Sequence, residues 1–167
     1  MNEHTIYRFN VEKLNGEEIS LSKYSNKVLL IVNTASACGF APQLNDLEEL
    51  RKEFENTDFE ILAFPSNDFG GQEPLDGAEI ESFCHVNHGA NYQMFGKIRV
   101  RGTYAHPLFK FLADKKLNGH IRSQPKWNFH KYLINRKGEV VDFFYPFTKP
   151  NSAKIKRKIT RLLSSQS

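Results

Sequence analysis

The stretch KVLLIVNT (residues 27–34), followed directly by ASACGFAPQ (residues 35–43), decides the fold of this chain. An uninterrupted apolar run rich in β-branched residues is typical of a central strand that is covered on both faces. Small residues end the run, and Pro42 suits the first turn of a helix. Residues 43–54 then place leucines and a phenylalanine at helical spacing. The order is therefore a buried strand, a small-residue loop and a helix.

The remainder of the chain continues the alternation of strands and helices, without an internal repeat or a linker. We expect a β-hairpin in residues 9–21, strands at 59–64, 132–135 and 140–145, and helices at 76–85, 107–115 and after residue 152. This pattern predicts an α/β fold with a mixed central sheet, helices on both faces and an N-terminal β-hairpin. A length of 167 residues fits one domain spanning 1–167.

The composition is that of a globular protein, with 40% hydrophobic and 25% charged residues, 10 glycines and 7 prolines. It excludes disordered, collagen-like and low-complexity proteins. The longest aliphatic run, residues 28–32, is far shorter than the ~20 residues that span a bilayer. Residues 1–10 contain Glu3 and lack the basic and apolar regions of a secretory signal, so we expect a cytoplasmic protein without stable membrane insertion.

The net charge of +4 comes partly from a basic segment, residues 154–161, in which isoleucines recur at amphipathic spacing. We interpret it as the solvated face of a packed terminal helix and expect no nucleic-acid partner. A nucleic-acid or lipid-surface binder that uses this helix is an alternative, which a salt-titrated binding assay would test.

Cys38 stands where the buried strand passes to the helix. Unpaired backbone N–H groups and the helix dipole at such a position lower the pKa of a thiol, so Cys38 is a candidate nucleophile. An inert buried cysteine is the alternative. Two cysteines are too few for a disulfide scaffold, and the chain is long enough to bury a core without one.

Three separated segments resemble the signature blocks of the glutathione peroxidase family: NTASACGFAPQ (33–43), FPSNDFGGQEP (64–74) and KWNFHKYLI (126–134). Their order and spacing match the family too, and the likeness covers nearly the whole chain. The resemblance implies a thioredoxin-like fold and reduction of hydroperoxides by a peroxidatic cysteine or selenocysteine. At the matching position this chain has an ordinary cysteine, Cys38.

The resemblance also implies the residues around the reacting sulfur, which are a Gln, a Trp and an Asn in the family and fall here on Gln72, Trp127 and Asn128. Their amide and indole N–H groups are hydrogen-bond donors. Donors of this kind hold a thiolate ionised and stabilise the charge on the departing oxygen. Without the resemblance, Gln72 would be interpreted as a turn residue and Trp127 as part of the core.

Cys84 matches the resolving cysteine of family members that close an internal disulfide and are recycled by thioredoxin. On sequence alone it could equally be a small apolar filler on a helix. Many relatives have a Cys and a Gln where this chain has Ser66 and Asp68. Cys84 is therefore the one internal resolving candidate, and we expect its helix, followed by a flexible exit at residues 87–89, to unwind in each cycle.

We therefore expect a thiol peroxidase that reduces hydrogen peroxide and organic or lipid hydroperoxides, binds no cofactor or metal, and uses thioredoxin as its external dithiol. The alternatives are glutathione as reductant, or a peroxide sensor or redox relay that passes its disulfide to a client protein. A metal site at Cys84, His85 and His88 lacks a nearby fourth ligand. A papain-like hydrolase would need a base that the sequence does not place. Residues 115–126 lack the extra loop of tetrameric relatives, which predicts a monomer.

Overall fold

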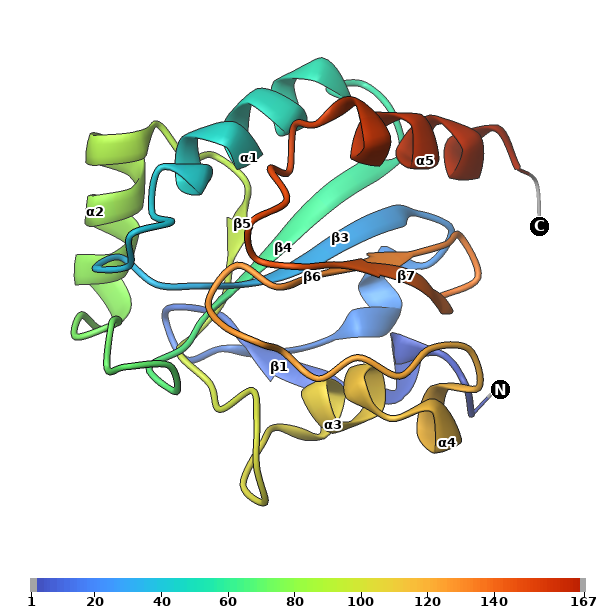
Figure 1. Ribbon diagram of the computed structural model, residues 1–167, viewed down its shortest axis with the longest axis horizontal. Coiled ribbons are helices and arrows are strands. Elements are labelled where there is room, and N and C mark those ends of the chain that lie inside the picture. The colour runs from blue at the N-terminus through green and yellow to red at the C-terminus, as the bar shows by residue number, and fades with distance from the viewer. Residues whose placement is uncertain (1–2, 166–167) are drawn as a thin grey trace.

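The computed structural model describes residues 3–165 and is built around a five-stranded mixed sheet (Figure 1). The strand order is β5-β4-β3-β6-β7, with parallel pairing of β3 to β4 and of β4 to β5, and antiparallel pairing of β3 to β6 and of β6 to β7. The strands are β3 (Val28–Thr34), β4 (Phe59–Pro65), β5 (Gln93–Met94), β6 (Lys131–Ile134) and β7 (Val140–Phe144).

The central strand β3 is buried along its whole length because its side chains enter two hydrophobic cores. Val28, Leu30 and Val32 belong to the core on one face, and Leu29 and Ile31 belong to the core on the other. This alternation follows from the two-residue period of a strand. An apolar run without polar interruptions is therefore what a strand covered on both faces requires.

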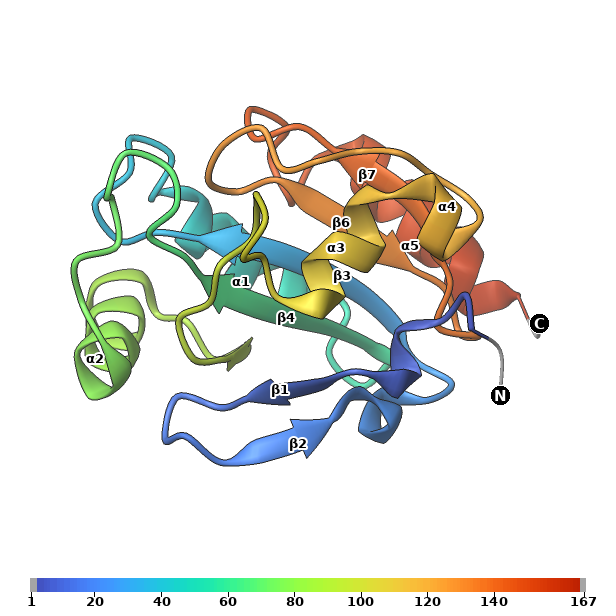
Figure 2. The same ribbon diagram turned by 90° about the horizontal axis from the view of Figure 1, so that it is seen from below.

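Helices cover both faces of the sheet, which confirms the predicted architecture (Figures 1 and 2). On one face lie α1 (Gln43–Glu53) and α5 (Ala153–Ser164), with α2 (Gly77–His88) beside α1. The other face carries the hairpin of β1 and β2 together with α3 and α4. Their bounds are β1 (Asn10–Glu12), β2 (Glu18–Ser20), α3 (Pro107–Ala113) and α4 (Lys115–Asn118), and two short 3₁₀ helices span Ile6–Arg8 and Leu21–Tyr24.

Several predicted boundaries were wrong. The helix expected at 76–85 runs from Gly77 to His88, so Asn87 and His88 are helical and do not form a flexible exit. It ends at Gly89, whose φ of 65° is left-handed and costs a glycine little. The helix expected at 107–115 ends at Ala113, and α4 follows after Asp114. Strand β5 was not predicted, and β7 ends one residue before Tyr145.

The basic terminal helix α5 packs against the core through Ile155 and Ile159. Two of its lysines are engaged within the molecule, because Lys156 pairs with Glu53 and Lys158 pairs with Asp142. The amphipathic interpretation of this segment therefore agrees with its packing. Among residues 3–165, none of the helices is both long and apolar enough to cross a membrane.

Candidate active site

Cys38 lies in a series of turns between β3 and α1, with 5% of its surface exposed. The backbone N–H of Phe40 donates to its sulfur, with an N···Sγ distance of 3.3 Å. This donor belongs to the turn ahead of α1, which begins only at Gln43, and not to the first turn of the helix as the sequence suggested. The sulfur of Cys38 therefore lies beside a backbone N–H donor at the start of this turn.

Gln72 and Asn128 come from segments 56 residues apart and meet in a direct hydrogen bond. The Asn128 amide Nδ2 donates to Gln72 Oε1 at 3.0 Å. The backbone carbonyl of Gln72 accepts the N–H of Ala37 at 2.9 Å, which ties Gln72 to the residue before Cys38. Within residues 3–165 the Gln72 NH₂ group has no hydrogen-bond partner, so it remains a donor for a bound molecule.

Trp127 joins the same arrangement by packing against both hydrophobic cores and against the ring of Phe69, with centroids 5.4 Å apart. Gly70 permits this packing, since a Cβ atom there would lie 3.2 Å from the indole ring. The φ of Gly70 is also +67°, a conformation that other residues rarely adopt. The loop that carries Gln72 is therefore fitted closely to Trp127.

The turn that carries Trp127 and Asn128 contains Phe129 at a φ of 68°. A left-handed conformation at a bulky residue costs on the order of 1–3 kcal/mol and persists only where the surroundings hold it. Here Asn33 and Lys131, both fully buried, bind this turn. The sequence analysis missed both residues, although a lysine inside an apolar strand segment was a signal of a buried charge.

Glu73 was also missed, although it stands beside Gln72 in the second signature block. Its carboxylate, 1% exposed, accepts hydrogen bonds from the backbone N–H of Ser36 (3.1 Å) and from its hydroxyl (2.6 Å). Burial raises the pKa of Glu73, although the hydrogen bonds from Ser36 oppose the shift. Glu73 thus fastens the loop of Gln72 to the loop of Cys38.

Cys84 lies on α2, is 2% exposed, and, like Cys38, is a free thiol. Burial, assisted by the charge of Glu73, raises the pKa of Cys84 to about 12. The thiol is therefore protonated and unreactive where it lies. Both cysteines belong to the same hydrophobic core, which joins β3, α1 and α2.

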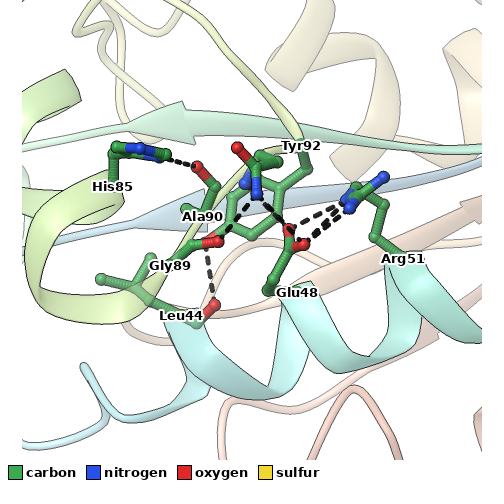
Figure 3. A network of polar contacts seen from close by, with 8 residues as sticks. Leu44, Glu48, Arg51, His85, Gly89, Ala90 and Tyr92 are labelled. Atoms are coloured by element: carbon green, nitrogen blue, oxygen red, sulfur yellow. Dashed lines mark hydrogen bonds and ion pairs between the residues drawn. The ribbon is translucent and has the colours of Figure 1, made fainter.

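The segment after α2 is fastened to α1 by a polar network (Figure 3). The Glu48 carboxylate accepts hydrogen bonds from Arg51 and from the backbone N–H of Asn91. Burial by itself would raise the pKa of Glu48, but these hydrogen bonds outweigh burial and lower it. Tyr92 donates its hydroxyl to the Leu44 carbonyl at 3.1 Å. The chain is thus anchored immediately beyond α2.

The histidines of α2 take part in the same anchoring. His85 contacts the carbonyl of Ala90 through Nδ1 at 3.2 Å, and His88 contacts Asn45 of α1 through Nδ1. Among residues 3–165, Cys84, His85 and His88 do not form a group that could hold a metal ion.

A cleft of about 860 Å³ opens beside Cys84, between α2, the end of α1 and the edge of β4. Its lining includes the carboxylates of Glu55, Glu60 and Glu81, together with Arg51, which Glu48 binds. The cleft is lined by Cys84 but by neither Cys38 nor the residues grouped around it. The two cysteines therefore face different surroundings.

Comparisons with known proteins agree with these features. A family model described as glutathione peroxidase matches residues 6–113. A glutathione peroxidase of Lactococcus lactis is 44% identical over 157 residues, which are 94% of this chain and 98% of that protein. A hydroperoxy fatty acid reductase of Synechocystis is 42% identical, covering 89% of this chain and 90% of that protein.

Solved structures show the same likeness. The crystal structure of T. cruzi GPX1 superimposes with a TM-score of 0.77 at 30% identity, covering 98% of this chain and 99% of that one. A thioredoxin family protein of Chlorobium tepidum shares the fold, with a TM-score of 0.63 at 14% identity and 93% of each chain covered. The predicted thioredoxin-like fold is confirmed.

Proposed function

Because the chain belongs to the glutathione peroxidase family and is a peroxide-reducing thiol peroxidase, we propose that Cys38 is the sulfur that attacks the peroxide. Its thiolate attacks the distal oxygen of a hydroperoxide, the O–O bond breaks, and that oxygen remains on Cys38 as a sulfenic acid. The remaining alkoxide or hydroxide takes up one proton and leaves as an alcohol or as water. The observation that supports this assignment is that Asn128 binds the side chain of Gln72, whose backbone carbonyl accepts the N–H of Ala37, next to Cys38.

The donors of Gln72, Trp127 and Asn128 supply the electrostatic part of this step. As the O–O bond breaks, negative charge moves from the sulfur to the departing oxygen, where N–H donors stabilise it most. The Gln72 NH₂ group suits this role because Asn128 already occupies the side-chain oxygen of Gln72. Since the anchoring groups around these side chains are buried, the donors are held in place before the peroxide arrives.

In the second step of the proposed cycle, Cys84 resolves the sulfenic acid. The Cys84 thiol loses its proton, its sulfur bonds to Cys38, and the sulfenic oxygen leaves as water. A disulfide needs Cα atoms within ~7 Å and a sulfur that can ionise. Because burial raises the pKa of the Cys84 thiol to about 12, we propose that α2 opens first. Only Ile80 and Cys84 of α2 are buried, which makes this helix inexpensive to detach. The anchor at Glu48 and Asn91 keeps the chain beyond it in place.

We further assign the reduction of the disulfide to a dithiol protein of the thioredoxin type. An internal disulfide suits a dithiol, which reduces it by two exchange steps. Of the glutamates that line the cleft beside Cys84, Glu60 pairs with Lys27, but the charges of Glu55 and Glu81 disfavour glutathione there, because that tripeptide is itself anionic. The proposal includes a monomer that acts in the cytoplasm on hydrogen peroxide and lipid hydroperoxides. The name of the Synechocystis relative, a hydroperoxy fatty acid reductase, supports the lipid substrates.

The test is an NADPH-coupled assay with hydrogen peroxide or a fatty acid hydroperoxide, comparing thioredoxin and its reductase with glutathione and its reductase. We expect rapid turnover with thioredoxin, slow turnover with glutathione, and no turnover for Cys38→Ser with the fold retained. Turnover by Cys38→Ser would refute the nucleophile. Faster turnover with glutathione would refute the reductant, and slow turnover with trapped mixed disulfides would indicate a relay.

A further inference from the structure

The left-handed turn at Phe129 sends the side chains of Asn128 and Phe129 in different directions. Before it, Asn128 reaches Gln72, and at it the Phe129 ring enters the hydrophobic core. A residue as bulky as phenylalanine does not hold a φ of 68° by itself. Something outside the turn therefore fixes the directions of Trp127 and Asn128.

Asn33, at the end of β3, binds three points of this turn. Its side-chain Nδ2 donates to the Trp127 carbonyl at 3.1 Å, and its Oδ1 accepts the N–H of His130 at 3.1 Å. Its backbone carbonyl accepts the N–H of Phe129 at 2.6 Å. The residue is fully buried, so water does not compete for these bonds.

Lys131, on β6, binds the backbone carbonyl of Phe129, whose N–H is bound by Asn33. Its ammonium, also fully buried, donates to the Phe129 carbonyl at 2.6 Å and to the Pro146 carbonyl at 3.2 Å. Asp46 on α1 supplies a nearby negative charge. An apolar side chain would fill the same space with no polar atom to satisfy, so the buried amine and its hydrogen bonds have a purpose other than filling the core.

From these contacts we infer that Asn33 and Lys131 are positioning residues for the reaction: they hold Phe129 left-handed and thereby fix Trp127 and Asn128 in the arrangement with Gln72 that is proposed above to receive the peroxide. The inference deepens the proposed peroxidase mechanism and rests on it. Neither residue touches the reacting atoms. Their effect passes through the turn between them.

The chain offers a matched control in Gln43, whose amide donates to the same Pro146 carbonyl at 2.7 Å but is not bonded to Phe129. Lys131→Met keeps the apolar stem and removes the hydrogen bonds to the carbonyls of Phe129, Tyr145 and Pro146. Gln43→Met removes only a bond to Pro146. Asn33→Leu, a near-isosteric change, removes the two side-chain bonds to the turn from the opposite side and leaves the backbone bond to Phe129; it serves if Lys131→Met does not fold.

The readout is the emission of Trp127, the single tryptophan of the chain, together with the rate of Cys38 oxidation by peroxide in stopped flow. We expect Lys131→Met and Asn33→Leu to shift the emission and its quenching before any peroxide is added. We expect oxidation to slow about tenfold or more, since small misplacements of catalytic groups are costly. Reduction of the preformed disulfide should keep its rate, and Gln43→Met should behave as wild type.

Wild-type emission and oxidation in a folded Lys131→Met or Asn33→Leu would overturn the inference. So would equal changes in Gln43→Met and Lys131→Met, because their shared loss is the bond to Pro146. If the wild-type protein itself did not react with peroxide, the proposed function would fail. The emission comparison would still decide whether these residues hold the turn.

Discussion

Truncation of Ile80 should accelerate closure of the disulfide between Cys38 and Cys84. Ile80 is fully buried and, with Cys84, is one of the two buried side chains of α2. Opening of α2 removes Ile80 from the core, so Ile80→Ala destabilises the closed helix without affecting the open one. Substitution of a buried isoleucine by alanine costs about 2–5 kcal/mol.

The lower end of that range already makes a large kinetic effect. If opening precedes attack by Cys84, about 2 kcal/mol raises the population of the open form, and hence the rate of closure, about 30-fold. The free energy of global unfolding should fall by a similar amount. The rate of the first step, oxidation of Cys38, should not change.

The assay follows free thiols by rapid quench and alkylation after one equivalent of peroxide. The control is Leu108→Ala, which truncates an equally buried residue of α3 on the opposite face of the sheet. It should lower global stability without accelerating closure, because Leu108 remains buried when α2 opens. Closure of Ile80→Ala at the wild-type rate would refute the view that α2 must detach.

Three further predictions concern the donors, the acid stability and the assembly state. Gln72→Ala and Asn128→Ala should each slow oxidation of Cys38 by ~10²-fold or more and leave the reductive step unchanged, which stopped flow measures; equal slowing of both steps would contradict their assignment. Burial, with the charges of Lys131 and Lys126, lowers the pKa of His130 from 6.5 to about 4, so the unfolded chain binds a proton that the folded one does not. Stability should therefore fall as the pH drops from about 6.5 to about 4, by up to ~3 kcal/mol, and urea titrations should show a shallower fall for His130→Gln. Light scattering at micromolar concentration should give a monomer, and a stable tetramer would contradict this.

The central elements could be predicted from the sequence because their apolar residue types indicate burial. Residues 27–34 are apolar on both faces, and the strand found is Val28–Thr34. Strand β5 was not predicted because only two of its residues pair with β4, at the edge of the sheet. The end of α2 was set too early because Asn87 and His88 look like turn residues. They are exposed or half-buried on the last helical turn, and the helix stops at Gly89.

The residues that hold the candidate site in place were harder to predict from the sequence than the site residues themselves. Cys38, Gln72, Trp127 and Asn128 could be named because residue types and motif spacing point to them. Glu73 and Lys131 act through hydrogen bonds to groups such as the Ser36 backbone and the Phe129 carbonyl. A backbone group carries no mark in the sequence of which side chain will bind it, so such partners emerge only from the fold.

Intact-mass analysis of the wild-type protein after one equivalent of peroxide tests the account most directly. The account predicts a loss of ~2 Da, because Cys38 and Cys84 close a disulfide, whereas Cys84→Ser should instead gain ~16 Da as sulfenic acid on Cys38. Thioredoxin should then restore the wild-type mass. A gain of ~16 Da in the wild type would contradict the account, since it would show that Cys84 does not resolve Cys38.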